Sequence, residues 1–156
     1  MYELELIVVA NAMEGFEKPV NRGISMATGD WIWILNDDVE FTGWWFIQPV
    51  QQAMNDSKVG LVNMTGYDWQ GLPSYWNVLV RKEAMDQVGM LDESFPTFSS
   101  DHDHAHRIRL AGWKIAHTGK PVTIHHKASS TTKDLPDEQE RIRKGKERMQ
   151  QKWGFS

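Results

Sequence analysis

A five-residue apolar run, Trp31 to Leu35, leads directly into three polar residues, Asn36, Asp37 and Asp38. Runs of this kind form buried strands, and open α/β sheets bind ligands beyond the carboxyl ends of their strands. Adjacent carboxylates repel each other unless solvent or a cation neutralises them, and their oxygens suit Mg²⁺ or Mn²⁺. The triplet therefore predicts a metal-assisted ligand site, although an acidic turn that caps the next helix explains it equally well.

Strand and helix patterns alternate along the rest of the chain. Strands are expected at residues 4–10, 31–35, 59–64, 75–80, 113–116 and 121–126. Helices are expected at 21–27, 44–54, 82–88, 101–111 and 137–153, with a loop at 11–20. This alternation favours an α/β sandwich. We expect one domain, in which a minimal core at 1–132 is followed by a charged helical tail at 133–156.

Composition excludes several classes of protein. The 156 residues contain no cysteine, so disulfides and thiolate metal sites are excluded. A formal charge of −4 argues against general nucleic-acid binding. No apolar run approaches the ~20 residues of a membrane span, and no secretory leader precedes Tyr2. The expectation is a soluble, cytoplasmic protein.

A second polar cluster begins the helix expected at 101–111. Asp101 and Asp103 fall in its first turn, where the helix dipole stabilises negative charge. Asp103 and Arg107 are four residues apart and can pair along one face, which leaves Asp101 free to face a substrate. The same helix carries histidines, so a metal hydrolase is a competing hypothesis, with its cluster at His102, Asp103, His104 and His106. A structural role explains these histidines with fewer assumptions.

His125 and His126 follow the last expected strand. An imidazole at that strand end could join Asp38 around one cation. A histidine with a purely structural role is the alternative at this position.

Five segments follow one another in a set order. They read NRGISMATGD at 21–30, WIWILNDDV at 31–39, GMLDESF at 89–95, DHDHAHR at 101–107 with Gly112, and HHKASS at 125–130. Together they resemble glycosyltransferase family 2 on the GT-A fold. Three positions depart from the family pattern: Asn36 in the first acidic place of the DXD motif, Ser100 for Glu, and Ala128 for Gly.

The resemblance implies a GT-A-like (Rossmann-like) mixed sheet flanked by helices. It also implies an inverting, hexosyltransferase-type enzyme that moves a sugar from a nucleoside diphosphate sugar, most plausibly a UDP-sugar, to a carbohydrate or other hydroxyl acceptor. By resemblance, Asp38 is the principal ligand of Mn²⁺ or Mg²⁺, His125 is a further ligand, and Asp101 is the general base.

The remaining residues of the implied site fall into two groups. Donor-binding residues are expected at Asn11, Asn21, Arg22, Asn36 and Asp37. Acceptor-side or supporting residues are expected at Asp92, Asp103, Arg107, Trp69 and Trp76. Ordinary loop packing explains the two tryptophans equally well.

The amino-terminal half is shorter than the family pattern. Residues 4–10 resemble the second strand of the family with its aspartate replaced, so the usual first strand and helix are missing. The uncovered sheet edge favours self-association of the chain. A homo-oligomer that completes the sheet is therefore expected. A catalytically degenerate relative that binds a sugar or nucleotide, or acts as a scaffold, is the alternative function.

Overall fold

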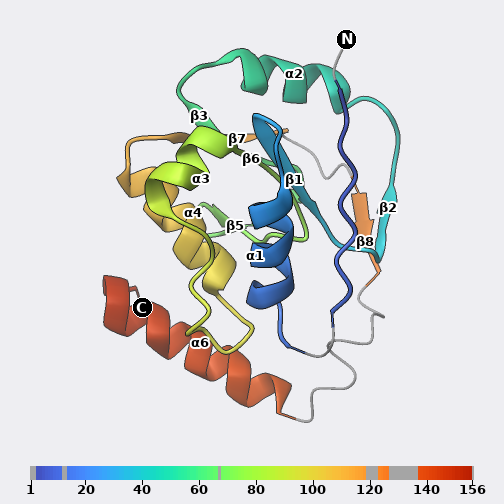
Figure 1. The fold of residues 1–156 in the computed structure, drawn as a ribbon. Coiled ribbons are helices and arrows are strands. Elements are labelled where there is room, and N and C mark those ends of the chain that lie inside the picture. Colours follow the sequence, from blue (N-terminus) through green and yellow to red (C-terminus); the bar gives the residue numbers. More distant parts are fainter. Residues whose placement is uncertain (1–2, 12–13, 67, 119–122, 127–136, 156) are drawn as a thin grey trace.

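The computed structural model describes residues 3–11, 14–66, 68–118, 123–126 and 137–155. A four-stranded mixed sheet forms its centre (Figure 1), with β1 (Trp31–Leu35), β6 (Asn77–Arg81), β3 (Val59–Asn63) and β7 (Lys114–His117) in that order. Strand β6 is antiparallel to β1 and β3, whereas β3 is parallel to β7. Two short ribbons pair β2 (Val39–Phe41) with β8 (Thr123–His125), and β4 (Asp68–Trp69) with β5 (Leu72–Pro73).

Helices cover both faces of the sheet. On one face lie α1 (Glu17–Met26), α3 (Lys82–Val88), α4 (Ser100–Leu110) and α6 (Glu138–Trp153), which share a buried apolar cluster with β1, β3 and β6. On the other face, α2 (Ile47–Asn55) packs on a second cluster. Strand β6 alternates between them, since Val78 and Val80 join the first cluster and Leu79 the second. The α/β fold class expected from the sequence is confirmed.

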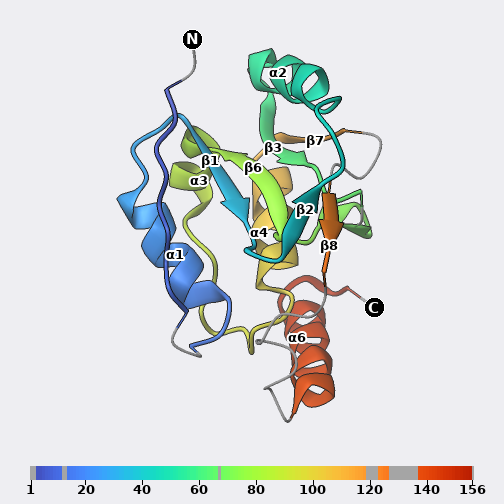
Figure 2. The same cartoon turned by 90° about the vertical axis from the view of Figure 1, so that its right-hand side faces the viewer.

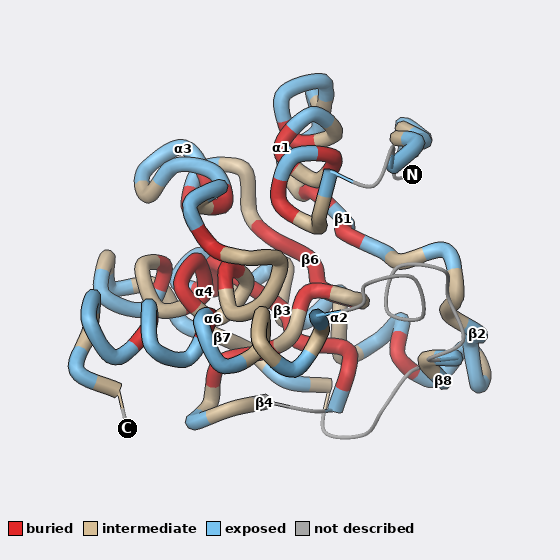
Figure 3. Tube along the Cα trace, turned by 90° about the horizontal axis from the view of Figure 1, so that it is seen from below, coloured by how far each residue is buried: buried red, intermediate tan, exposed pale blue. Residues whose placement is uncertain are grey.

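Burial is concentrated on the inner strands. Figure 3 shows buried residues along β3, β6 and the inner side of α4. None of the helices in the described ranges is both long and apolar enough to cross a membrane.

The strand expected at residues 4–10 is wrong. The described part, from residue 3 to 11, is assigned to no strand, and the side chains of Leu4, Leu6 and Val8 are 83%, 84% and 84% exposed. The segment runs alongside α1 (Figure 2), and a cavity separates it from the edge of β1. Its apolar, β-branched composition favours a strand, but a strand needs a hydrogen-bonded neighbour, and no strand of the described residues pairs with this segment.

Helix α1 begins four residues earlier than the sequence predicted. Gly15, with φ +89°, ends the preceding loop, and the helix starts at Glu17 rather than Asn21. Pro19 belongs to the loop expected at 11–20, but it lies in the first turn of α1, where a missing N–H costs no hydrogen bond.

A buried polar pair holds the loop before β6 against α4. The Nε2–H of His104 donates to the Gly89 carbonyl at 2.9 Å, so its Nδ1 accepts from the Tyr75 hydroxyl at 2.7 Å. Burial, reinforced by the positive charge of Arg107, lowers the pKa of His104 to about 3, so the imidazole is neutral at neutral pH. Burial also raises the pKa of Tyr75 well above its ordinary value, which keeps the phenol a donor.

Helix α6 approaches the segment before α4 very closely at Gly145. A Cβ at this position would lie 2.6 Å from the Phe98 carbonyl oxygen and 3.0 Å from the Ser99 hydroxyl. Farther along, Met149 is fully buried in the main cluster. The helix therefore fixes the loop that leads into Asp101.

We predict that His104 makes stability fall with acidification. The unfolded histidine titrates near 6.5 and the folded one near 3, so only the unfolded chain binds this proton between those values. The free energy of unfolding should decrease below pH 6.5 by at most about 1.4 kcal/mol per pH unit from this residue. Urea denaturation of His104→Gln at several pH values should show a shallower slope than the parent, and equal slopes would contradict the assignment.

We also predict that Gly145→Ala destabilises the fold by about 1–3 kcal/mol through overpacking against Phe98. Alanine is intrinsically the better helix former by roughly 0.5–1 kcal/mol, so the clash must exceed that gain. Urea unfolding measures the difference, with Gln151→Ala on the exposed side of α6 as a control that should change little. Unchanged or increased stability in Gly145→Ala would show that α6 does not press on this segment.

Candidate functional site

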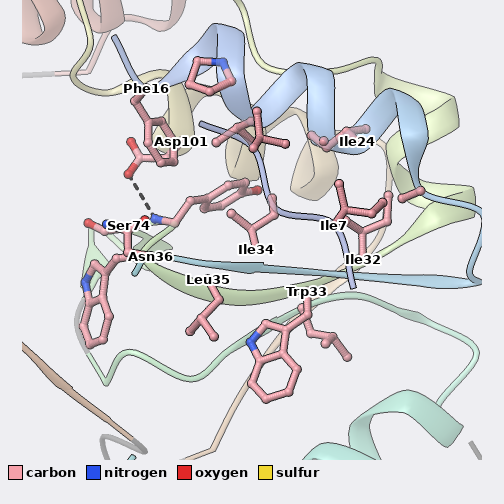
Figure 4. Close-up of a pocket in the computed structure, with 18 of the residues that line it drawn as sticks. Ile7, Phe16, Ile24, Ile32, Trp33, Ile34, Leu35, Asn36, Ser74 and Asp101 are labelled. Atoms are coloured by element: carbon pink, nitrogen blue, oxygen red, sulfur yellow. Dashed lines mark hydrogen bonds between the residues drawn. The ribbon is translucent and has the colours of Figure 1, made fainter. Parts of the chain in front are cut away.

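A cavity of ≈ 3450 Å³ extends along the free side of β1 and past its carboxyl end. At that end, its lining includes Asn36, Asp37, Asp38, Asp101 and His125. Figure 4 shows Asp101 and Ser74 beyond the end of β1, beside Asn36. Residues from three distant parts of the chain thus line one cavity.

Asp38 and His125 come together through the ribbon of β2 and β8. Val39 pairs with His125, and the His126 amide donates to the Asp38 carbonyl at 2.9 Å. The His125 Nε2 atom therefore lies 3.0 Å from the Asp38 Oδ1 atom. Both Asp38 carboxylate oxygens are shielded from water, and neither accepts a well-oriented hydrogen bond from the described residues. Within the described residues, the His125 imidazole is the neighbour of this shielded carboxylate, and such a pair can serve as ligands of a cation.

The Trp76 ring stacks on His125, with ring centroids 4.7 Å apart and planes at 9°. Trp76 also accepts a hydrogen bond at its carbonyl from the Asn36 amide, at 3.0 Å. The tryptophan therefore fixes one face of the imidazole beside the end of β1.

Asp101 lies in the first turn of α4. Its Oδ1 accepts the His102 amide at 2.8 Å, and its Oδ2 accepts the Tyr75 amide at 3.2 Å, the dashed line in Figure 4. These two N–H donors hold the Asp101 carboxylate at the amino end of the helix. The loop that carries Tyr75 and Trp76 thus contacts both Asp101 and His125, and links the two halves of the site.

A second carboxyl group, which the sequence did not reveal, lies near Asp101. Glu17, in the first turn of α1, is 3% exposed. Burial raises the pKa of Glu17. A hydrogen bond with Ser100 opposes this shift, and the negative charge of Asp101 adds to it by a smaller amount. Glu17 stands in a stretch expected to be a loop, so no pattern marked it as buried.

The expected donor-binding residues separate into two groups. Asn36, Asp37 and Asn11 line the cavity. The Asn11 side chain is already used within its own loop, where it donates to the Gly15 carbonyl at 3.0 Å and accepts the Glu14 amide at 3.1 Å.

Asn21 and Arg22 do not line this cavity. The Asn21 side chain is buried, and it exchanges hydrogen bonds with the Leu91 backbone at 2.9 and 3.0 Å. Arg22 pairs with Glu14 at 2.9 Å on the exposed side of α1. Their contacts tie α1 to the rest of the fold.

The expected supporting residues Asp103 and Arg107 are joined by a hydrogen bond of 2.9 Å on α4. Asp103 is fully buried and also accepts from Trp153 at 2.8 Å, with the Lys152 amine 2.8 Å away. These contacts attach α6 to the helix that carries Asp101.

Asp92 and Trp69 contribute to the same packing. Asp92 accepts from Ser94 and pairs with Lys152 at 2.9 Å. Partial burial opposes its charge, but these hydrogen bonds prevail and hold the pKa of Asp92 well below its usual range. The Trp69 ring packs against Phe155, with centroids 5.3 Å apart.

The histidines of α4 do not form a metal cluster. The His106 ring contacts Trp153 and Phe155 edge-on, and its Nδ1 lies 3.1 Å from Arg109. Burial, with the charge of Arg109, lowers the pKa of His106. Across the described ranges, no group of three or more His, Cys, Asp or Glu side chains is placed to hold a metal ion. The hydrolase hypothesis has no site there.

The curated relatives include an N-acetylglucosaminyl-diphospho-decaprenol L-rhamnosyltransferase of Mycobacterium tuberculosis, 39% identical over 57 residues. The aligned part is 36% of this chain and only 19% of the relative, so the chain spans about a fifth of that protein.

Two solved structures share the fold. One is the mannosyltransferase PcManGT from Pyrobaculum calidifontis in complex with GDP-Man and Mn²⁺, with TM-score 0.65 and 13% identity over 86% of this chain and 43% of that one. The other is the catalytic domain of Drosophila β1,4-galactosyltransferase 7 in complex with xylobiose. Its TM-score is 0.57 and its identity 16%, and the match covers 82% of this chain and 60% of that one. The expected GT-A-like fold is confirmed.

The family model described as "Glycosyl transferase family 2" matches residues 2–110, which include β1, the acidic turn after it and the whole of α4. This match spans more than half of the chain and contains four of the five segments noted in the sequence. The chain belongs to glycosyl transferase family 2.

Proposed function

We propose that this chain transfers a sugar from a nucleoside diphosphate sugar, with a UDP-sugar as the expected donor, to a hydroxyl acceptor with inversion at the anomeric carbon. One observation carries the proposal. The Asp38 carboxylate lies beside His125 without a well-oriented hydrogen bond from the described residues, in the same cavity as Asp101.

Asp38 and His125 fit a divalent cation. An orphaned carboxylate and an imidazole nitrogen supply oxygen and nitrogen ligands that suit Mn²⁺ or Mg²⁺, with diphosphate and water oxygens to complete the set. When bound, such a cation would offset the charge that develops on the leaving diphosphate. The Mn²⁺ named with the Pyrobaculum enzyme supports the choice of metal. Stacking on Trp76 holds the imidazole in place for this role.

Asp101 acts as the general base. Its carboxylate removes the proton from the acceptor hydroxyl, whose oxygen forms the new bond to the anomeric carbon as the bond to the diphosphate breaks. Attack from the face opposite the leaving group inverts the configuration. The Tyr75 and His102 amides hold the carboxylate in position, while Asn36 and Asp37 face the donor side of the cavity.

A catalytically inactive donor-binding protein is the second candidate. The observation that favours it is the volume of the cavity, ≈ 3450 Å³, which exceeds the roughly 300–1,000 Å³ of a typical ligand site. The two candidates share metal and donor binding and differ only in turnover, so one set of variants separates them.

We predict that Mn²⁺ and a nucleotide sugar together stabilise the protein. At a ligand concentration of roughly 100 times Kd, the melting temperature should rise by about 5–10 °C, and neither component alone should give this shift. Asp38→Asn should abolish the joint shift. The control is Glu40→Gln, which alters an exposed carboxylate–histidine pair on the same ribbon, Glu40 with His126 at 2.9 Å, and should keep the shift. A full shift in Asp38→Asn would rule out the metal role.

We predict a different result for Asp101→Asn. Release of nucleotide in the presence of acceptor should fall about 10²–10⁴-fold, because proton removal is lost. The melting shift with Mn²⁺ and donor should remain, because the metal pair is intact. Screening UDP-, GDP- and dTDP-sugars by nucleotide release identifies the donor for this test. Parent-level turnover in Asp101→Asn would exclude it as the base, and binding without turnover in the parent would favour the inactive alternative.

A further inference from the structure

Two buried polar side chains next to Asp101 have no part in the proposed reaction. Glu17, in the first turn of α1, is 3% exposed, and Ser100, the first residue of α4, is 1% exposed. Among the described residues, neither the Glu17 Oε1 atom nor the Ser100 hydroxyl finds a hydrogen-bond partner of good geometry. Buried polar groups are almost always hydrogen-bonded, so the presence of both side chains here needs an explanation.

Glu17 lies close to Ser100 and to Asp101. Burial raises the pKa of Glu17, the poorly oriented contact with the Ser100 hydroxyl opposes this rise, and the negative charge of Asp101 adds to it. Of the charged side chains that the structure describes, Asp101 is the one whose field shifts the pKa of Glu17. Arg141 approaches from α6, but it donates to the Thr97 hydroxyl at 3.5 Å. The two carboxyl groups therefore interact across the start of α4.

The segment that leads into Asp101 is held in a strained conformation. Thr97 and Ser99 have φ angles of +76° and +73°, in the left-handed region that glycine adopts most easily. The segment lies between the start of α1 and helix α6 (Figures 1 and 2), and a Cβ on Gly15 would lie 2.9 Å from the Thr97 hydroxyl. Strain of this kind persists only where neighbouring structure enforces it. The start of α1 and helix α6 together therefore fix the position of Asp101.

Position 100 is also one of the three places where the sequence departs from its family pattern. The pattern has a glutamate immediately before the base, whereas this chain has Ser100. In the fold, the Glu17 carboxyl meets the Ser100 side chain from a different helix. A carboxyl is thus present beside position 100, although another part of the chain provides it.

We propose that Glu17 is a positioning residue for Asp101, and that from α1 it supplies the carboxyl that the family pattern places at position 100. This role of Glu17 rests on the proposed function of Asp101 as general base. Glu17 is not among the residues that line the cavity, so it acts through Asp101 and not on the substrate.

The role follows from the change of charge during proton transfer. Asp101 takes the proton of the acceptor hydroxyl as the acceptor oxygen bonds to the anomeric carbon and the diphosphate leaves, so its carboxylate becomes neutral. An ionised Glu17 repels the charge on Asp101 before this step and no longer does so after it, which favours the transfer. A protonated Glu17 gives no such assistance. Turnover should therefore rise with pH as Glu17 loses its proton, and the raised pKa of Glu17 places this rise above the usual range of a glutamate.

Removing the charge of Glu17 without changing its shape tests the role. Glu17→Gln should lose this rise in the pH profile of nucleotide release. The control Glu83→Gln, which alters the exposed glutamate in the first turn of α3, should keep it. Melting temperatures close to that of the parent show that both variants fold. An unchanged pH profile in Glu17→Gln would overturn the proposal, because packing alone would then explain Glu17.

Moving the carboxyl from α1 to α4 gives a second test. The double variant Glu17→Ser/Ser100→Glu places the carboxyl where the family pattern has it, and should retain the rise that Glu17→Ser alone loses. The matched control Glu17→Ser/Ser100→Gln has the same number of heavy atoms without the charge, and should not retain the rise. Equal pH profiles in the two double variants would mean that volume and not charge matters at this position, and would overturn the proposal.

A carboxyl titration separates this role from the proposed function, because it needs no turnover. The ¹³C resonance of the Glu17 carboxyl should titrate above the usual range of a glutamate in the parent, and at lower pH in Asp101→Asn, where the neighbouring charge is gone. An identical titration in the two proteins would overturn the positioning role even in an active enzyme. A shifted titration in a parent that releases no nucleotide from any donor would contradict the proposed function and, with it, the role of Glu17.

Discussion

The pairing of β2 with β8 is the constraint on which the site depends. It pairs Val39 with His125, which is 86 positions later in the chain, and so sets the Asp38 carboxylate 3.0 Å from the His125 imidazole. Each strand is only three residues long. Both oxygens of the Asp38 carboxylate are shielded from water, and neither accepts a well-oriented hydrogen bond from the described residues. A carboxylate in that state costs free energy unless a cation or ligand compensates.

The other half of the site depends on buried polar contacts rather than on the sheet. The His104–Tyr75 hydrogen bond fixes the loop whose amide holds Asp101, and the Asp103 contacts attach α6 behind the same helix. Each polar group in these contacts has a hydrogen-bond or ion-pair partner. Because such bonds need specific partners, they fix one arrangement of the helices and the loop, which apolar packing alone would not. Asp103 and Arg107, expected as supports of the base, make contacts that suit that role.

Much of this arrangement could be predicted from the sequence. The strand expected at WIWIL and the helix expected at 82–88 are found at those residues, as β1 and α3. In both segments the local sequence pattern agrees with the burial in the fold. Residues 4–10 have equally strong strand composition, but a strand also needs a neighbour, and composition says nothing about whether one is present. Tertiary contacts, which residue type does not reveal, also explain two other differences. Glu17, expected in a loop, is buried near Asp101. Asn21, expected to bind the donor, donates a hydrogen bond to the Leu91 carbonyl instead.

Paramagnetic broadening by Mn²⁺ tests the central claim most directly, because it reports where the cation binds and does not depend on turnover. In the presence of UDP, substoichiometric Mn²⁺ should broaden the side-chain resonance of His125 and the backbone resonances around Asp38 before those of His102 and His106. Broadening centred on His102 and His106, or spread evenly over the surface carboxylates, would contradict the account.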